Sequence, residues 1–439
     1  MKKNQEKKPF TVLHTSDWHL GKQLKDHKRY DEYILFLSWL ENQIRNHHID
    51  ALLIAGDIFD TITPPTYAQE LYYSFLGRLL TTSCKQIVIT GGNHDSATFL
   101  NAPKSVLKFL NVTVIGGMPE NYEDEIVILK DTEGRPAAIV CAVPYLREGD
   151  VRKPQPDDTP EKRELRLAEG IRSHYEEVLA IAQLKQEDFG NNVPIIAMGH
   201  LFTRGGRAVD GDGVRQLYVG SLQGLDPVIF GTIPDYVALG HLHIAQDVKA
   251  DIPVRYSGSP IRMSFDEGEK EKSVTMVSFQ GKECLSVQKL PVPEFRTLMS
   301  IRGTQKEILN KLQEVADNLP EQSKYRVSAK TDPDSPFQGS IWVQIILTEE
   351  QHPAALREEI SRTVNTPEIS VLQILLERKP GTISYDLDES EELNTLDEMK
   401  VFDMLLAAKN IAPKDQDILR ELYKEIVDAI HLGDGSNKE

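Results

Sequence analysis

The segment Ala51–Asp60, ALLIAGDIFD, joins a short apolar run to a glycine and two aspartates. The run ALLIA has the length of a strand, and its unbroken apolar character is typical of a strand that is covered on both faces. Four more apolar runs also end directly at a glycine or a polar residue: Phe10–Thr15, Gln86–Thr90, Pro194–Met198 and Asp235–Leu239. This repeated pattern predicts a set of buried strands whose ends carry polar loops.

Helical patterns separate these runs, with apolar residues spaced three and four positions apart. They cover Tyr30–Arg45, Thr66–Leu80, Phe99–Leu110 and Pro160–Gln183. Strands that alternate with helices indicate an α/β fold, here a layered core of β-sheets flanked by helices. In such folds ligands bind beyond the carboxyl ends of the strands, which is where the polar loops fall.

The chain of 439 residues has room for about three domains. Residues 1–289 hold the strand-and-loop pattern, and residues 290–380 predict a small α+β capping domain. Residues 381–439 begin with an acidic linker and continue into two amphipathic helical patterns, Leu396–Ala408 and Lys414–Ile430. These two helices are suited to docking a protein partner, although packing on their own domain explains them equally well.

The composition is that of a folded, acidic protein, with 50 basic and 67 acidic residues and a net charge of −17. No stretch approaches the roughly 18 apolar residues of a membrane span. The basic start MKKNQEKKPF lacks the apolar segment of a secretory signal. The three cysteines form no CxxC pattern, which disfavours a disulfide framework. We therefore expect a cytoplasmic protein without a membrane partner, and one that does not bind nucleic acids through a generally basic surface.

The polar loops carry side chains of the kinds that bind metals. These are Asp17, His19, Asp57, Asn93, His94, Asp95, His200, His241 and His243. Each one alone is explained equally well as an ordinary turn or capping residue. Gathered at one sheet edge, however, the ionised carboxylates would repel each other and lose their hydration unless cations bind there. Carboxylate, amide and imidazole ligands without thiolates suit Mn²⁺, Fe²⁺ or Zn²⁺.

Five motifs in this order resemble those of the calcineurin-like metallophosphoesterases. They are TSDWHLG (Thr15–Gly21), GDIFD (Gly56–Asp60), GNHD (Gly92–Asp95), GH (Gly199-His200) and GHLH (Gly240–His243). The resemblance implies two divalent ions, most often Mn²⁺, with Mg²⁺, Fe²⁺ or Zn²⁺ as alternatives. One ion would take Asp17, His19, Asp57 and His243, and the other would take Asp57, Asn93, His200 and His241. His94 would be the catalytic histidine, and Asp95 would orient it through a hydrogen bond.

Within this family, the segment Tyr256–Pro260 (YSGSP) and the domain order are most similar to the DNA nucleases. That similarity implies 3′-to-5′ exonuclease activity on duplex ends and endonuclease activity on single strands and hairpins, in DNA end processing and repair. Candidate phosphate contacts are the basic residues near the first motif and after the fourth, namely Lys22, Lys25, Lys28, Arg29, Arg204 and Arg207. Each of them is explained equally well as a solvated surface charge.

The same similarity implies a coiled-coil ATPase partner, bound through the C-terminal helices, and a homodimer within a heterotetramer at the nucleoid. The dimer contact would come from Thr66–Leu80 and Phe99–Leu110, through Leu71, Phe75, Leu107 and Leu110. These four side chains fit an intramolecular core equally well. Two other functions stay open, a phosphodiesterase or phosphatase for small molecules or phosphoproteins and a scaffold without activity. The C-terminal third disfavours the first, and the intact His94 disfavours the second.

Overall fold

The computed structural model describes most of the chain up to residue 377. The described residues are 8–153, 159–206, 224–268, 270–318, 341–348 and 368–377, together with 357, 359, 360, 362, 406, 416, 419, 420, 422 and 423. The chain forms two units, residues 1–377 and residues 378–439. The predicted C-terminal helices and Arg207 lie outside the described residues, apart from a few single positions, and the predicted three-domain division stays a prediction.

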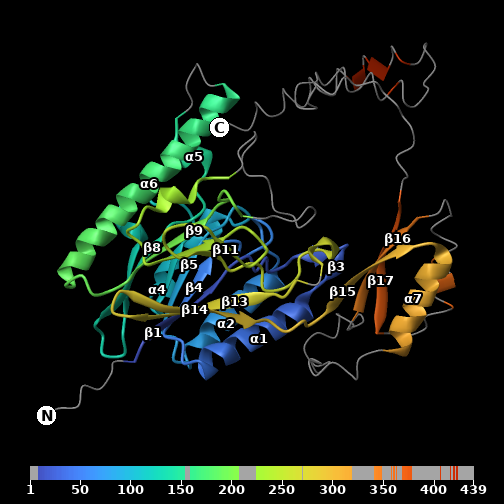
Figure 1. Cartoon of the computed structure of the whole chain (residues 1–439), viewed down its shortest axis with the longest axis horizontal. Coiled ribbons are helices and arrows are strands. Elements are labelled where there is room, and N and C mark those ends of the chain that lie inside the picture. Colours follow the sequence, from blue (N-terminus) through green and yellow to red (C-terminus); the bar gives the residue numbers. More distant parts are fainter. Residues whose placement is uncertain are drawn as a thin grey trace. The chain divides into compact units, whose positions relative to one another are not determined.

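Two mixed sheets of six strands form the main part of the first unit (Figure 1). The first sheet has the order β14 (Glu283–Pro291), β13 (Ser273–Gln280), β1 (Phe10–Thr15), β4 (Ala51–Ala55), β5 (Gln86–Thr90) and β6 (Val112–Ile115). The second has the order β11 (Gln246–Val248), β12 (Val254–Tyr256), β10 (Tyr236–Gly240), β9 (Ile195–His200), β8 (Pro136–Ala142) and β7 (Ile126–Lys130). The strands that precede the motifs are parallel neighbours at the centre of each sheet.

The two sheets pack face to face, and helices cover their outer faces. Along β4, Leu53 faces a core shared by both sheets, whereas Leu52 and Ile54 face the helices, as the two-residue period of a strand requires. Helices α1 (Tyr30–Asn46) and α2 (Thr66–Leu79) cover the first sheet, and α6 (Pro160–Asp188) covers the second. The sequence-based prediction of β-sheets flanked by helices is confirmed.

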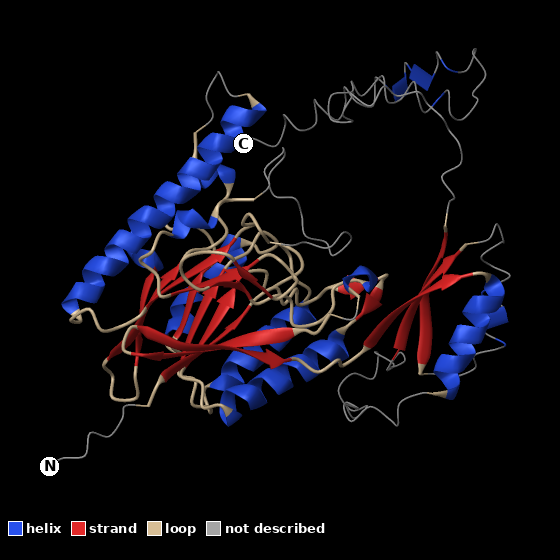
Figure 2. Cartoon of the chain, viewed as in Figure 1, coloured by secondary structure: helices blue, strands red, loops and turns tan. Residues whose placement is uncertain are grey.

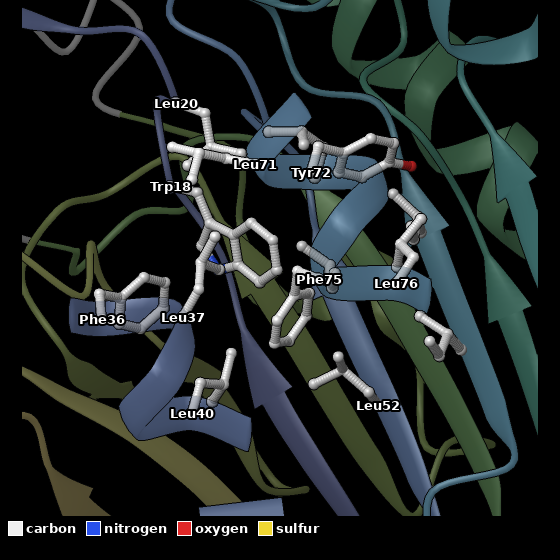
Figure 3. Packing of buried hydrophobic residues seen from close by; sticks show 14 of the residues in the cluster. Trp18, Leu20, Phe36, Leu37, Leu40, Leu52, Leu71, Tyr72, Phe75 and Leu76 are labelled. Carbon is white, nitrogen blue, oxygen red and sulfur yellow. The ribbon is translucent and has the colours of Figure 1, made fainter. Parts of the chain in front are cut away.

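Trp18 lies at the centre of the core beneath the first sheet, although its neighbours in the sequence are two of the predicted metal ligands. Its indole ring packs edge-on against Phe36 of α1 and Phe75 of α2, with ring centroids 5.7 and 5.5 Å away (Figure 3). Its Nε1 donates to Thr15 Oγ1 at 2.9 Å. The buried indole therefore anchors the loop after β1 to the helices.

A third, smaller sheet consists of three parallel strands, β15 (Thr297–Gly303), β16 (Ile341–Leu347) and β17 (Ile369–Leu376). Helix α7 (Gln305–Asp317) packs on one face of this sheet, with Ile308 and Leu312 fully buried (Figure 2). Its first turn is closed by a capping box between Thr304 and Glu307. Strand, helix and strand thus follow the pattern expected for this part of the sequence.

A short hairpin after the first motif joins the main layers to the third sheet. Strands β2 (Gln23–Leu24) and β3 (His27–Lys28) meet at a two-residue turn, Lys25-Asp26, in which both residues have positive φ. Leu24 packs in one buried cluster with Phe265, Leu298 and Trp342. The predicted basic loop is therefore an ordered hairpin whose one apolar side chain, Leu24, packs with residues of the third sheet.

One predicted helix is wrong in its extent. Phe99–Leu110 is divided into α3 (Ala97–Asn101) and α4 (Lys104–Lys108). Pro103 lies between them and has no N–H to continue the first helix, so it caps the second one instead. The side chains proposed for dimerisation belong to the intramolecular core, because Leu71, Phe75 and Leu107 are buried beneath the first sheet.

None of the helices in the described part of the chain combines the length and apolar character needed to cross a bilayer.

Candidate metal centre

The site is built where the central strands of both sheets end. Asp17 follows β1, Asp57 follows β4, and Asn93 follows β5 in the first sheet. His200 ends β9, and His241 follows β10 in the second. Hydrogen bonds join the backbones of the first two loops, from Asp17 N to the Gly56 carbonyl at 3.1 Å and from His19 N to the Asp57 carbonyl at 2.9 Å. Side chains from five loops are thus fixed at one place.

Side-chain nitrogen and oxygen atoms converge there at distances that suit a shared cation. His19 Nε2 lies 3.1 Å from His243 Nε2 and 3.5 Å from Asp57 Oδ2. His200 Nε2 lies 3.2 Å from the same Asp57 oxygen and 3.0 Å from Asn93 Oδ1. His241 Nδ1 is 3.3 Å from that Asn93 oxygen. Asp17 completes the set, since its carboxylate oxygen lies within 4.8 Å of ligand nitrogens of His19 and His243, so the seven residues predicted to bind metal are neighbours in the structure.

Four of these seven residues have backbone conformations that side chains rarely adopt. The φ angles of Asp17, His19, Asp57 and His241 are +53°, +47°, +50° and +102°. Positive φ costs about 1–3 kcal/mol for a residue with a side chain, and such strain persists where the surroundings enforce it. The surroundings are tight, because a Cβ atom at Gly92 would overlap the Asp57 carboxylate. Backbone strain concentrated at these residues is typical of a functional site.

Outer hydrogen bonds fix which ring nitrogen two of the histidines, His200 and His94, present to the site. His200 Nδ1 lies 3.0 Å from the Ala55 carbonyl, and His94 Nδ1 lies 2.8 Å from the Asp60 carbonyl. A carbonyl only accepts, so both Nδ1 atoms carry the proton and Nε2 is left for the site. Such backbone partners orient histidines that bind metals. Asp17 is held in the same manner, since it accepts from Ser16 Oγ at 2.5 Å and from His241 N at 2.8 Å.

The charges of the two central carboxylates are set by burial and by the imidazoles. Burial raises the pKa of Asp17 to about 6. Burial alone would lower the pKa of His200, but the facing Asp57 carboxylate reverses this and raises it to about 9. Burial and the charge of His200 lower the pKa of His241 to about 3. Without a bound ion, the site therefore balances the Asp57 carboxylate with a proton on His200.

The donor set fits divalent metal ions. Three overlapping groups have ligand atoms close enough to hold one ion: Asp17 with His19 and His243, His19 with Asp57 and His94, and Asp17 with Asp57 and His200. The first group agrees with three of the four residues expected for one ion. Asp57 belongs to the other two groups, as a residue between two ions would. Buried carboxylates with neutral nitrogen donors and no thiolate suit Mn²⁺, Fe²⁺ or Zn²⁺.

The predicted role of Asp95 is wrong. Its carboxylate accepts from the backbone N–H groups of Ile58, Phe59 and Gly92 at 3.1, 3.0 and 2.9 Å. His94 donates instead to the Asp60 carbonyl. His94 and Asp95 are adjacent in a turn, and their side chains point in different directions. The three bonds to Asp95 join the second and third motif loops. Burial raises the pKa of its carboxyl to about 6.

Two residues at the site were not assigned from the sequence. Asp60 Oδ1 lies 3.3 Å from His19 Nδ1 and 3.1 Å from Lys22 Nζ. Its place as the second aspartate of GDIFD was a usable signal. The Tyr145 ring meets His200 edge-on, with centroids 6.4 Å apart. Tyr145 follows β8, whose apolar sequence resembles the runs before the motifs.

The basic residues proposed as phosphate contacts divide into distinct groups. Lys25 and Lys28 are exposed on the hairpin, and Arg204 is exposed with its guanidinium 4.0 Å from Asp226. Lys22 is half-buried at the site beside Asp60. Arg29 is 1% exposed, and its two bonds of 2.7 and 2.9 Å to Glu32 leave it no access to a ligand. The prediction that Arg29 contacts DNA is wrong, because its guanidinium is buried and forms an ion pair with Glu32.

Comparisons with known proteins agree with these motifs. A family model described as calcineurin-like phosphoesterase matches residues 10–245. A second model, described as the type 5 capsule protein repressor C-terminal domain, matches residues 294–410.

Curated relatives cover much or nearly all of the chain. The SbcD subunit of the nuclease SbcCD from Escherichia coli (strain K12) is 32% identical over 94% of this chain and 96% of its own length. The corresponding SbcCD nuclease subunit from Rhodobacter capsulatus is 33% identical over 67% of this chain and 72% of its own length. That of Bacillus subtilis is 33% identical over 62% and 67%.

Mn²⁺ binding should release protons and strengthen as the pH rises. The raised pKa of His200, about 9, means that this imidazole is protonated at neutral pH and must lose its proton to become a ligand. We expect calorimetry in buffers of different ionisation enthalpy to detect proton release, with affinity increasing from about pH 6 to about pH 9. Replacing the exposed His47 by Asn should leave both unchanged. A flat pH profile would contradict the His200–Asp57 charge pair.

Arg29→Ala should destabilise the fold rather than affect ligand binding directly. Among the described residues, it leaves Glu32, which is 3% exposed, with the more distant Arg296 Nε at 3.4 Å as its remaining ion-pair partner. The loss should approach about 3 kcal/mol, the lower end for a broken buried ion pair. Urea unfolding followed by circular dichroism measures it. Lys28→Ala, an exposed neighbour, should change stability by less than about 0.5 kcal/mol, and equal midpoints for the two variants would refute the assignment.

Proposed function

The chain belongs to the SbcD family of calcineurin-like phosphoesterases, and from this premise we propose that it is the nuclease subunit of an SbcCD-type complex. The observation that carries the proposal is the cluster of two buried carboxylates, one amide and four imidazoles at the strand ends. The near full-length similarity to a curated nuclease subunit supports DNA as the substrate.

In the proposed centre, Asp17, His19, Asp57 and His243 would hold one divalent ion, and Asp57, Asn93, His200 and His241 would hold the other. Such a pair, most suitably Mn²⁺, supplies charge stabilisation of the phosphodiester and activation of water. Other groups of the chain orient these ligands. Ala55 and Asp60 orient imidazoles through their carbonyls, and the His241 N–H and Ser16 hydroxyl hold Asp17.

His94 is the proposed acid that meets the leaving oxygen. Its Nδ1–H is held by the Asp60 carbonyl, so Nε2 is the atom that exchanges a proton with substrate. Burial lowers the pKa of His94, which favours release of that proton once it has been taken up. Proton transfer by a positioned histidine typically contributes a rate factor of about 10² to 10⁴.

The proposed activities are 3′-to-5′ exonuclease cleavage of duplex ends and endonuclease cleavage of single strands and hairpins, in DNA end processing and repair at the nucleoid. Lys22, Lys25 and Lys28 support a DNA path beside the site, because their hairpin leads directly out of the first motif. The net charge of −17 confines attraction of phosphate to such local patches.

The proposed partners are an SbcC-type coiled-coil ATPase, docked on the C-terminal helices, and a second copy of this chain. For the homodimer, the proposed contact uses exposed apolar side chains, because Leu71, Phe75 and Leu107 are buried in the chain's own core. Val106 is 65% exposed on α4, and Phe109 is 89% exposed just after it. Exposed apolar groups of this size are typical of association surfaces when they cluster.

Purified protein with Mn²⁺ should cut end-labelled linear DNA, and His94→Ala should lower kcat by about 10² to 10⁴. Asp57→Ala should abolish cutting, because it removes the proposed ligand shared by both ions. His47→Ala, a change of an exposed histidine, is the matched control. A small chromogenic phosphodiester is assayed in parallel. Cleavage of this ester alone would contradict DNA cutting by the isolated chain, and repeating the assay with the ATPase then decides whether DNA is the substrate.

Removal of residues 381–439 should abolish co-purification with the ATPase while leaving hydrolysis of the small phosphodiester intact. The reason is that the proposed docking helices lie in this segment, whereas all the proposed metal ligands precede residue 244. Pull-down of the ATPase measures the first effect. Retention of the ATPase by the truncated chain would refute docking through these helices.

A further inference from the structure

Lys272, a lysine outside every motif, contacts the backbone of a proposed metal ligand. It directly precedes β13, and its side chain is only 10% exposed. Its Nζ donates to the His243 carbonyl at 2.9 Å and to Ser259 Oγ at 2.8 Å. The carboxylate of Glu267 lies 2.5 Å away as its counter-charge. The ammonium group thus makes two hydrogen bonds and one ion pair with protein atoms.

The His243 carbonyl is an unusually well-held acceptor. Besides the bond from Lys272, it accepts from the N–H of Ser259 at 3.2 Å. The single hydroxyl proton of Ser259 lies nearer the Ile261 carbonyl, at 2.9 Å, than the His243 carbonyl, at 3.3 Å. Ser259 belongs to the YSGSP segment, for which neither the sequence nor the metal centre has so far provided a role. Fixing this carbonyl fixes the peptide on one side of His243, and so restricts where its imidazole can lie. That imidazole lies with its Nε2 3.1 Å from His19 Nε2.

Burying an ammonium group for the sake of stability alone is a poor arrangement. The desolvation cost of a buried ion pair often matches or exceeds its attraction, and an apolar pair of similar size is frequently as stable. Glu267 is itself 2% exposed, and its other oxygen accepts from Met263 N at 2.8 Å. Burying this pair is therefore costly. What it uniquely provides is a rigid cationic donor at the back of His243.

We propose that Lys272 is a positioning residue of the metal centre, which holds His243 in place for one of the two ions, with Glu267 as its counter-charge. The proposal rests on the proposed two-ion site. His243 is expected in the set of one ion only, so the role is selective. Losing Lys272 should weaken that ion and spare the one held by His200 and His241.

The backbone of Lys272 links the His243 loop to the segment between β14 and β15, which leads into the third sheet. Its carbonyl accepts from Val292 N at 2.8 Å, and Val292 lies in the segment that leads to β15. Ile261, Lys272 and Val292 also form part of the lining of one cavity of about 390 Å³. One residue thus joins the segment before β15 to a ligand loop through its main chain and its side chain.

The test measures Mn²⁺ binding to the metal-free full chain, by calorimetry and by electron paramagnetic resonance. Lys272→Met should weaken one of the two sites by about 10- to 100-fold, as loss of an outer partner of a ligand does. The spectrum should change from that of a coupled Mn²⁺ pair to that of isolated Mn²⁺. Glu267→Gln, which keeps the donors to His243 and Ser259, should retain both sites.

The variants separate positioning from folding. If Lys272→Met unfolds because it leaves Glu267 unpaired, the double variant Glu267→Gln/Lys272→Met removes both charges and should fold with the same loss of one ion. A folded single or double variant that binds both ions as the wild type does would overturn the proposal. Loss of one ion by Glu267→Gln to the same extent would also overturn it. Wild-type protein that takes up no Mn²⁺ would instead refute the proposed function.

Discussion

The burial of two carboxylates side by side is the constraint on which the rest of the site depends. Asp17 and Asp57 are at most 2% exposed. Two such charges removed from water need compensation, and everything around them supplies it. Protonated His200 faces Asp57, and a hydroxyl and an N–H group face Asp17. A divalent cation would replace the proton of His200 with a larger charge. The strained backbone of the loops is tolerated because the core beneath them is rigid.

That rigidity comes from the packing of the two sheets. The central parallel strands of both sheets end at the same edge of the layered core, so five loops far apart in the sequence meet there. Trp18 fastens the first loop to α1 and α2 from below, and Asp95 ties the second loop to the third. The ligand side chains are thus oriented before any ion arrives, which is the condition for a pre-organised site.

The parts of the fold and site that follow from local pattern could be predicted from the sequence. The strands are apolar runs, and the rule that ligands gather at strand ends brings His200 and His241 next to Asp57 across two sheets. Other features depend on tertiary contacts that no local pattern encodes. In the sequence, Arg29 looks like one more charge of a basic loop, yet in the structure it is buried and paired with Glu32. Lys272 belongs to no motif, because its role is set by where β13 begins in space. The break at Pro103 was visible in the sequence, since proline interrupts a helix.

The hairpin after the first motif limits which changes this chain can accept beside its metal centre. Its first strand follows His19 by four residues, and its tip has positive φ at Lys25 and Asp26. The side chains of Leu24 and His27 both contact Trp342 of the third sheet. An insertion or deletion there would shift either a ligand or the contact with the third sheet. The length of the segment between His19 and Tyr30 is therefore constrained at both ends in this chain, so the charge beside the site can be altered by substitution without remodelling the loop.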